Sequence, residues 1–115
     1  MHEVSLVSNI WKSLKDSLKP DELNSLSKIK LKIGTLSCVE PKILETAYKM
    51  LVEDTNYHDV KLEFNIIQAE AECPHCGINF KVEHFRFICP QCSQPTNKVI
   101  AGEEFLIESV EFHKS

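Results

Sequence analysis

Four cysteines in the second half of the chain form two pairs with the same internal spacing. The first pair consists of Cys73 and Cys76 and the second of Cys89 and Cys92, and twelve residues separate the two pairs in the sequence. Two residues between cysteines let both thiolates bind one ion from a tight turn, and Gly77 can adopt the positive φ that such a turn often needs. Two such turns brought together by a hairpin supply four sulfurs in a tetrahedron, the arrangement of Zn²⁺ in closed structural sites. The spacing therefore predicts a structural zinc site.

Other uses of these cysteines stay open or are disfavoured. A rubredoxin-like iron site also uses two such turns, because iron accepts a tetrahedron of thiolates as well. Disulfides are disfavoured, since charged residues near the start interrupt any signal-like apolar run, and we expect a cytoplasmic chain with reduced thiols. A catalytic zinc would need an open coordination position, which four thiolates do not leave. We expect Cys38 to be a small buried side chain, or at least not a zinc ligand.

Length and charge limit the function classes. A chain of 115 residues makes one domain, or one small domain plus a metal-held module. Its longest apolar stretch is far shorter than a membrane span, so we expect no membrane partner. A net charge of −4 argues against a nucleic-acid partner, which normally needs a basic surface. We therefore interpret Phe80, Phe85 and Phe87 as a small core beside the metal rather than a surface for stacking on bases.

Two segments carry apolar residues at the spacing of an amphipathic helix. In residues 3–18 such residues recur every three or four positions, and Pro20 is expected to end the helix. A second helix is predicted from Pro41, which suits a first helical turn, to about Glu53. Ser37 is its candidate N-cap. The residues that indicate this second helix are Ile43, Leu44, Ala47, Tyr48 and Leu51.

Strict alternation of residue types predicts strands elsewhere. Residues 28–33 alternate lysine with isoleucine or leucine, which indicates a strand with one buried face and one lysine face. We interpret the lysine face as a solvated face that resists aggregation rather than as an anion site. Residues 60–66 alternate in the same way, and residues 102–112 are also strand-like.

The order of these elements predicts an α+β fold in which two helices pack on a small three-stranded mixed sheet. Strand, helix and strand within about forty residues favour a parallel pair joined by a right-handed crossover. The last strand can then add antiparallel to the same sheet. We expect the cysteine segment to be an inserted zinc-ribbon module. The predicted domains are thus a helix–sheet domain of residues 1–68 and 104–115, and a zinc-binding domain of residues 69–103.

The first residues can also bind a metal. We expect Met1 to be retained, because aminopeptidases generally remove methionine only before small residues and His2 is large. The amine of Met1, the backbone amide and imidazole of His2 and the amide of Glu3 can then form fused chelate rings. Three or four nitrogens suit square-planar Ni²⁺ or Cu²⁺. From these residues alone the metal signal is weak, because a histidine at position 2 is usually just a solvated terminal side chain.

The whole pattern resembles the HypA/HybF family of nickel metallochaperones for [NiFe]-hydrogenase maturation. The resemblance rests on Met1-His2-Glu3, a first amphipathic helix, the stretch from Leu31 to Pro41, the two cysteine pairs and a final strand. It implies nickel at His2 with the Met1 amine and Glu3 amide, and structural zinc at the four cysteines. It also implies that the carboxylates of Glu3 and Glu40 are additional candidate nickel ligands.

The resemblance further implies partners and a mechanism. A nickel metallochaperone binds Ni(II) at its N-terminus and delivers it to the hydrogenase large-subunit precursor, with help from the nickel-insertion GTPase. The docking surface would lie near His2 and Glu40, and a homodimer is compatible with the pattern. The chain is then not an enzyme, and its chemistry is ligand exchange. The residues alone also leave open a zinc-ribbon adaptor that transports no metal, and an electron carrier with iron between the cysteine pairs.

Overall fold

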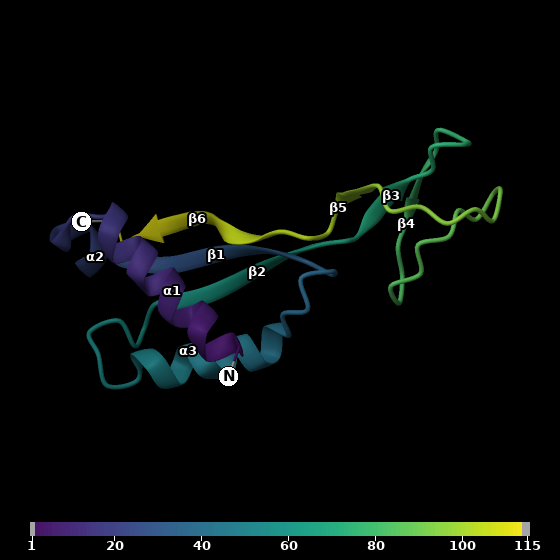
Figure 1. Cartoon of the computed structure of the whole chain (residues 1–115). Helices are drawn as coiled ribbons and strands as arrows, with labels where there is room; N and C mark the ends of the chain where they lie inside the picture. The colour runs from purple at the N-terminus through teal and green to yellow at the C-terminus, as the bar shows by residue number, and fades with distance from the viewer. Residues whose placement is uncertain (1, 114–115) are drawn as a thin grey trace. The chain divides into compact units, whose positions relative to one another are not determined.

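The computed structural model describes residues 2–113 and has the predicted α+β architecture (Figure 1). Helices dominate the first half of the chain and strands the second. Within the described residues, the helices are too short or too polar to cross a membrane. The elements are α1 (His2–Ser17), α2 (Pro20–Asn24), β1 (Leu26–Gly34), α3 (Pro41–Val52), β2 (Lys61–Ile67), β3 (Glu70–Glu72), β4 (Asn79–Lys81), β5 (Val99–Ala101) and β6 (Phe105–Phe112).

The chain divides into two compact units, which we call the helix unit and the cysteine unit. The helix unit consists of Met1–Leu31, Val39–Phe64 and Ile107–Ser115, and the cysteine unit of Lys32–Cys38 and Asn65–Leu106. The boundaries predicted from the sequence, residues 1–68 with 104–115 and residues 69–103, stay a prediction about which parts fold as domains.

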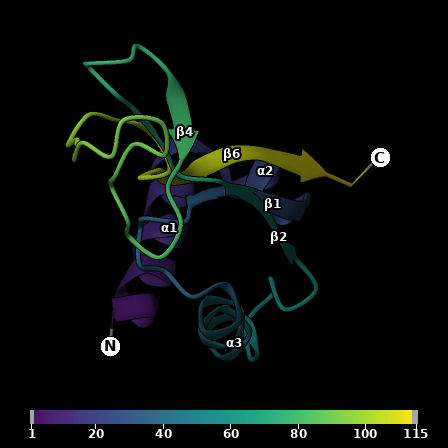
Figure 2. The ribbon, with the colours of Figure 1, turned by 90° about the vertical axis from the view of Figure 1, so that its right-hand side faces the viewer.

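The helix unit buries one face of α1 against α3 (Figure 2). Both helices show the apolar period that predicted them. The buried residues of α1 are Val7, Ile10, Trp11 and Leu14, and those of α3 are Leu44, Tyr48 and Val52. The Trp11 ring stacks on Tyr48 at a centroid distance of 6.3 Å, and the Tyr48 hydroxyl donates a 2.8 Å hydrogen bond to the Val60 carbonyl. This bond satisfies a polar group that would otherwise be buried without a partner.

The helix ends differ from the sequence prediction in two places. Pro20 follows the end of α1 but also begins the short helix α2, because proline suits the first position of a helix. The Lys19 amide there donates a 2.8 Å hydrogen bond to the Glu22 carboxylate. Pro41 begins α3 as predicted, but the residue at the N-cap position is Glu40. The prediction of Ser37 as N-cap is therefore wrong, because the chain between Ser37 and Pro41 is not helical.

The larger sheet is mixed and has the strand order β2-β1-β6, with β1 and β2 running in one direction and β6 in the other (Figure 1). Ile29 and Leu31 of β1 are fully buried. The lysines that alternate with them are not simply solvated, because β1 is the central strand. The Lys28 amine lies 3.0 Å from the Glu63 carboxylate on β2 and 3.7 Å from Glu111 on β6. The hydrogen bond and charge of Glu63 raise the pKa of Lys28, and Lys28 lowers the pKa of Glu63 in turn.

The cysteine unit contains a second, antiparallel sheet with the order β4-β3-β5. Ala71 at the centre of β3 lies opposite Phe80 on β4 and Val99 on β5. Strands this short could not be recognised by alternation in the sequence. The cluster of buried residues around the cysteines is small and consists of Ala69, Ala71, Cys73, Phe80, Val82 and Cys89.

Two glycines of the cysteine unit allow its segments to approach closely. A Cβ atom at Gly34 would lie 2.0 Å from the Gly102 carbonyl oxygen, and one at Gly102 would lie 2.4 Å from the Cα of Ala69. Residues next to Gly34 are hydrogen-bonded across this contact, since the Thr35 amide donates to the Ile67 carbonyl and the Leu36 amide to the Gly102 carbonyl. Because Gly34 has no side chain, the segment Lys32–Cys38 can approach the rest of the unit closely enough to form these hydrogen bonds.

Candidate metal centre

The four predicted cysteines come together in the cysteine unit. Their sulfur atoms all lie within 4.8 Å of one another, and the sulfurs of Cys73 and Cys92 are 3.5 Å apart. A tetrahedron with Zn–S bonds of about 2.3 Å has sulfur–sulfur edges of about 3.8 Å. Cys73 and Cys89 are fully buried and Cys76 and Cys92 are half-buried, so each pair supplies one inner and one outer sulfur. None of the five cysteines of the chain forms a disulfide.

The same backbone turn positions both pairs. In the first turn the Gly77 amide donates to the Cys73 carbonyl at 2.7 Å, and in the second the Ser93 amide donates to the Cys89 carbonyl at 2.9 Å. The residue after the second cysteine has a positive φ in each turn, 72° at Gly77 and 63° at Ser93. The sequence indicated this conformation at Gly77 but not at Ser93, because serine seldom adopts it.

The electrostatics of the four-cysteine group favour a bound cation. The hydrogen bond from Cys76 to Cys92 and the burial of Cys76 raise the pKa of the Cys76 thiol to about 12. Burial also opposes ionisation of Cys89, but the backbone amides of Cys92 and Gln91 outweigh it and lower the pKa of that thiol to about 7. Without a cation, the group thus accommodates one thiolate more easily than several, since like charges at this distance repel.

The donor set fits a divalent zinc ion. Thiolates bind the metal in their deprotonated form, so an ion of charge +2 removes the repulsion that keeps the thiols protonated. Four sulfurs leave no open position, which fits a structural rather than a catalytic site. The Cys76 amide also points at the Cys73 sulfur at 3.4 Å, a contact that stabilises a thiolate. The four cysteines therefore form a metal-binding group that fits zinc; the same tetrahedron would accept iron.

Two expectations of burial are wrong. Cys38 is exposed rather than buried and has a backbone φ of 63°, although it lies outside the four-cysteine group as expected. It follows the end of β1, and its thiol donates a weak hydrogen bond of 3.8 Å to the Leu36 carbonyl. Phe80 and Phe87 do pack in the small core, but Phe85 is 58 % exposed. Phe85 follows His84 in a turn where both residues have a positive φ, a conformation that residue type alone does not predict.

The residues predicted to bind nickel belong to the helix unit. Met1 lies outside the described residues, and of His2 only its place as the first residue of α1 is described. Glu3 lies in the first turn of α1, and Glu40 caps α3 through its backbone while its side chain makes no capping hydrogen bond. Val4 and Lys42, which follow these residues along the two helices, line the same hollow of about 360 Å³. The beginnings of α1 and α3 therefore lie on one side of the helix unit.

A mixed α+β fold combined with a four-cysteine metal-binding group defines a small metal-binding protein with a zinc-ribbon-like module. A family model described as "Hydrogenase/urease nickel incorporation, metallochaperone, hypA" matches residues 1–112. The chain belongs to this family. Its members are metallochaperones and maturation factors rather than enzymes, which confirms the expectation that the chain is no enzyme.

Individual relatives agree with this assignment over nearly the whole chain. The chain is 30% identical to the hydrogenase maturation factor HypA of Aquifex aeolicus over 96% of both chains. It is 33% identical to HypA of Dehalococcoides mccartyi over 96% of this chain and 93% of the relative. The solution structure of the nickel metallochaperone HypA from Helicobacter pylori has the same fold, with a TM-score of 0.63, 20% identity and 98% of both chains covered.

Proposed function

We propose that this protein is a nickel metallochaperone that binds Ni(II) at its N-terminus and delivers it to the precursor of the [NiFe]-hydrogenase large subunit. Family membership over residues 1–112 carries the proposal. The four-cysteine group holds a structural Zn(II) ion that is not transported, because a closed tetrahedral site exchanges its metal poorly.

The proposed nickel ligands are the His2 imidazole, the Met1 amine and the backbone nitrogens of His2 and Glu3. The position of His2 at the start of α1 supports this set. The first four amides of a helix have no partner within the helix, so these nitrogens are available to a metal without breaking a backbone hydrogen bond. Three or four nitrogens favour square-planar nickel.

The carboxylates of Glu3 and Glu40 are the proposed additional ligands. Glu40 is exposed and directly precedes α3, and its side chain is not used as a cap. The hollow shared by Val4 and Lys42 supports a Glu40 carboxylate on the same side of the helix unit as the first turn of α1. A carboxylate would complete the coordination sphere but would not anchor the ion.

Release to a partner follows from the same arrangement. A terminal site that is built partly from backbone lets an incoming ligand displace one donor at a time. The proposed partners are the nickel-insertion GTPase and the large-subunit precursor, with a cytoplasmic location and a homodimer as further parts of the proposal. The docking surface we propose lies beside the beginnings of α1 and α3, where Val4 and Ile43 are 47 % and 46 % exposed. Such apolar side chains at a hollow are typical of interfaces.

A nickel titration of protein with a native N-terminus tests the proposal. His2→Ala should abolish stoichiometric binding without unfolding the protein, because the imidazole anchors the chelate. A few residues added before Met1 should be almost as damaging, since they convert the terminal amine into an amide. Glu40→Ala should weaken binding less. Binding should also weaken as the pH falls toward the imidazole pKa of about 6.5, because the proton competes with the metal.

His58→Ala is the matched control, because it removes an exposed imidazole elsewhere in the helix unit. It should leave the titration unchanged. Normal binding by the extended protein would show that the terminal amine is not a ligand. Normal binding by His2→Ala would place the nickel site elsewhere. If the protein held zinc but took up no nickel, it would be a zinc-ribbon adaptor instead.

A further inference from the structure

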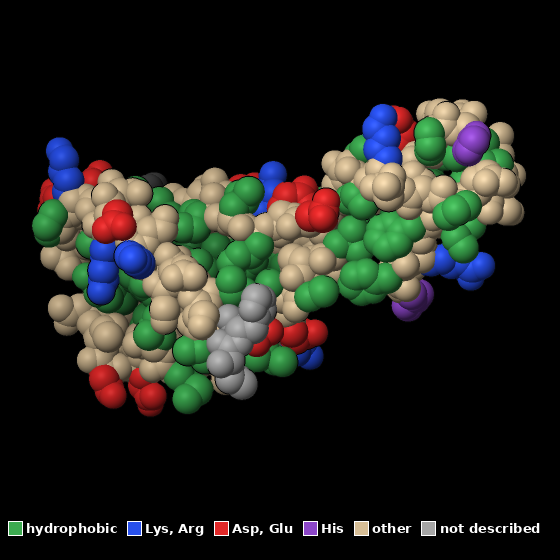
Figure 3. Space-filling view, in the orientation of Figure 1, with side chains coloured by type: hydrophobic (Ala, Val, Ile, Leu, Met, Phe, Trp, Pro, Cys, Tyr) green, Lys and Arg blue, Asp and Glu red, His purple; other side chains and the backbone are tan. Residues whose placement is uncertain are grey.

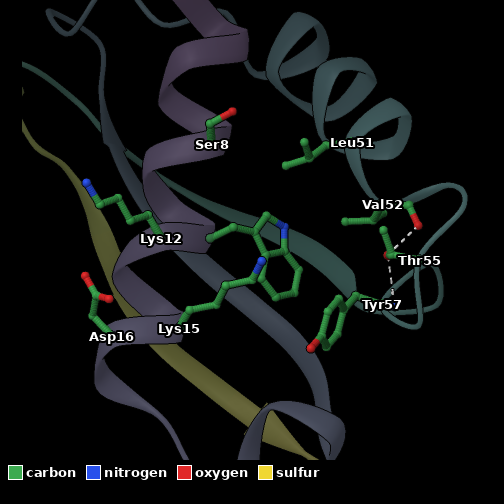
Figure 4. Close-up of a pocket in the computed structure, with 9 residues that line it drawn as sticks. Ser8, Lys12, Lys15, Asp16, Leu51, Val52, Thr55 and Tyr57 are labelled. Atoms are coloured by element: carbon green, nitrogen blue, oxygen red, sulfur yellow. Dashed lines mark hydrogen bonds between the residues drawn. The ribbon is translucent and has the colours of Figure 1, made fainter. Parts of the chain in front are cut away.

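A pocket of about 450 Å³ lies in the helix unit between α1 and the turn that follows α3 (Figure 4). Leu51 and Val52 at the end of α3 form one wall, Tyr57 forms another, and Trp11 of α1 contributes its indole ring. This volume falls in the range of about 300–1,000 Å³ that is typical of small-molecule sites. Of the proposed metal ligands whose side chains the structure describes, namely Glu3, Glu40 and the four cysteines, none lines it.

The indole nitrogen of Trp11 is the most informative atom of this pocket. Trp11 is only 5 % exposed, and its Nε1 atom is buried without a hydrogen-bond partner among the residues described. The ring is held in place by Tyr48 on one side and by Tyr57, whose ring centroid is 4.7 Å away. Buried donors in proteins are nearly always paired, and an indole N–H can only donate. The missing partner is therefore a hydrogen-bond acceptor.

Charge near the pocket indicates which kind of acceptor. Lys12, Lys15 and Asp16 of α1 all line the pocket, but only the Lys15 side chain extends toward the side where Tyr57 lies, whereas the ends of Lys12 and Asp16 point away (Figure 4). Within the described part of the chain, none of these three residues is recorded in an ion pair within 4.0 Å. An ammonium group thus faces an apolar space on a chain whose net charge is −4. A negatively charged acceptor would satisfy both Lys15 and Trp11.

We propose that this pocket binds a small organic acid. Its carboxylate accepts hydrogen bonds from the Lys15 ammonium and the Trp11 indole, and its flat apolar body packs against Leu51 and Val52. Such an acid can be a free molecule or the carboxyl-terminal residue of a peptide, because both present an apolar group next to a carboxylate. This inference does not depend on nickel or zinc binding. A negative result for the pocket would therefore not count against the proposed nickel site, and a negative nickel titration would not count against the pocket.

The chain contains one tryptophan, so the indole N–H resonance and the fluorescence of the zinc-bound, full-length protein report on this pocket alone. Phenylacetate is the first probe and should shift the indole resonance saturably at millimolar concentrations. Phenylacetamide has the same shape without the charge and should bind about tenfold more weakly, since hydrogen bonds to a charged acceptor are the stronger ones. Acetate lacks the apolar body and should produce no saturable shift.

N-acetyl-glycyl-phenylalanine distinguishes the two sources of the carboxylate. Tighter binding of this peptide than of phenylacetate would indicate that the pocket recognises a peptide carboxyl terminus. Saturation by phenylacetate alone would indicate a free acid. Failure of both probes to shift the resonance would overturn the proposal.

Two lysines on the same helix provide a matched pair of variants. Lys15→Gln should reduce the affinity for phenylacetate to that for phenylacetamide, whereas Lys12→Gln removes the same charge from a side chain that points away and should change it less than about twofold. Equal losses in the two variants would show only general electrostatic attraction and would overturn the proposal. Equal binding of phenylacetate and phenylacetamide, unaffected by Lys15→Gln, would do the same. Both lysines are exposed, so the fold is expected to persist in either variant.

Discussion

The helix unit and the cysteine unit bury very different side chains. Large aliphatic residues fill the helix unit, among them Leu26, Ile29, Leu31 and Leu44, each with 2 % exposure or less. The cluster of buried residues around the cysteines contains two alanines, one valine, one phenylalanine and two of the proposed zinc ligands. Each fully buried aliphatic side chain contributes about 1.5–3 kcal/mol to folding, whereas an alanine contributes far less. The comparison teaches that one chain can rely on apolar burial in one unit and on a bound metal in the other.

Removal of the metal should give the largest difference between the two units. Structural zinc contributes on the order of 10–16 kcal/mol in small zinc modules. A strong chelator should therefore unfold the cysteine unit while the helix unit keeps its amide protection, which amide hydrogen exchange followed by NMR would resolve residue by residue. Cys73→Ser should have the same effect.

Cys38→Ser is the control for this experiment, because Cys38 is exposed and lies outside the four-cysteine group. Its zinc content should match that of the unchanged protein. An ordered cysteine unit after metal removal would contradict the comparison, and iron in the isolated protein would contradict the choice of zinc.

A cavity created in the helix unit should have the opposite effect to metal removal: it should destabilise the helix unit and leave the cysteine unit intact. Leu44 is fully buried on α3, and Leu44→Ala should lower the free energy of unfolding of the helix unit by about 2–5 kcal/mol. Zinc content should not change. Urea unfolding followed by the fluorescence of Trp11, together with metal analysis, measures both quantities. Leu51→Ala on the same helix is the matched control: Leu51 is 40 % exposed, so a comparable loss there would refute the assignment of the core.

A smaller effect is expected from the backbone of the two cysteine turns. A side chain at Gly77 would meet no atom within 4 Å, so Gly77→Ala tests only the positive φ and should cost about 1–2 kcal/mol. Ser93→Gly should stabilise the second turn by less than that, because glycine also gains freedom in the unfolded chain. Competition with a zinc chelator of known affinity compares the variants. A stabilising Gly77→Ala would show that the turn has another conformation.

The smallest effect we predict concerns the hydroxyl of Tyr48. Tyr48→Phe removes its hydrogen bond to Val60 and should cost about 1 kcal/mol near neutral pH. Burial, and then the charge of Asp59, raise the pKa of Tyr48 above its ordinary value of 10.0. The neutral phenol therefore stabilises the fold fully below pH 10 and progressively less as the pH rises toward the raised pKa. The unchanged protein should lose stability above pH 10 more steeply than Tyr48→Phe, and parallel pH profiles would contradict this.

The parts predicted well from the sequence were those with a long, regular period or a strict spacing. The apolar period of α1 and α3, the alternation in β1 and the cysteine spacing each depend on local geometry, which the sequence carries directly. The packing of Phe80 and Phe87 near the cysteines was also predicted correctly.

The errors concern features that only the folded chain determines. The first helix does end before Pro20, but the short helix α2 was missed, because a proline also suits the beginning of a helix and only the path of the chain shows that one follows. Cys38 and Phe85 both have a positive φ, a conformation that residue type alone does not predict. The interpretation of the lysine face of β1 missed its glutamate partners, because they lie on strands distant in the sequence.

The close contact at Gly34 and Gly102 has a consequence for dividing the chain into fragments. The cysteine unit is assembled from two separate pieces of the sequence, Lys32–Cys38 and Asn65–Leu106. A contiguous fragment with all four cysteines but without the first piece would lose the donors that Thr35 and Leu36 supply to Ile67 and Gly102. Such a fragment would expose a backbone edge with unpaired carbonyls. A synthetic peptide of residues 32–38 supplied in trans should restore the lost hydrogen bonds, as in a split protein that reassembles.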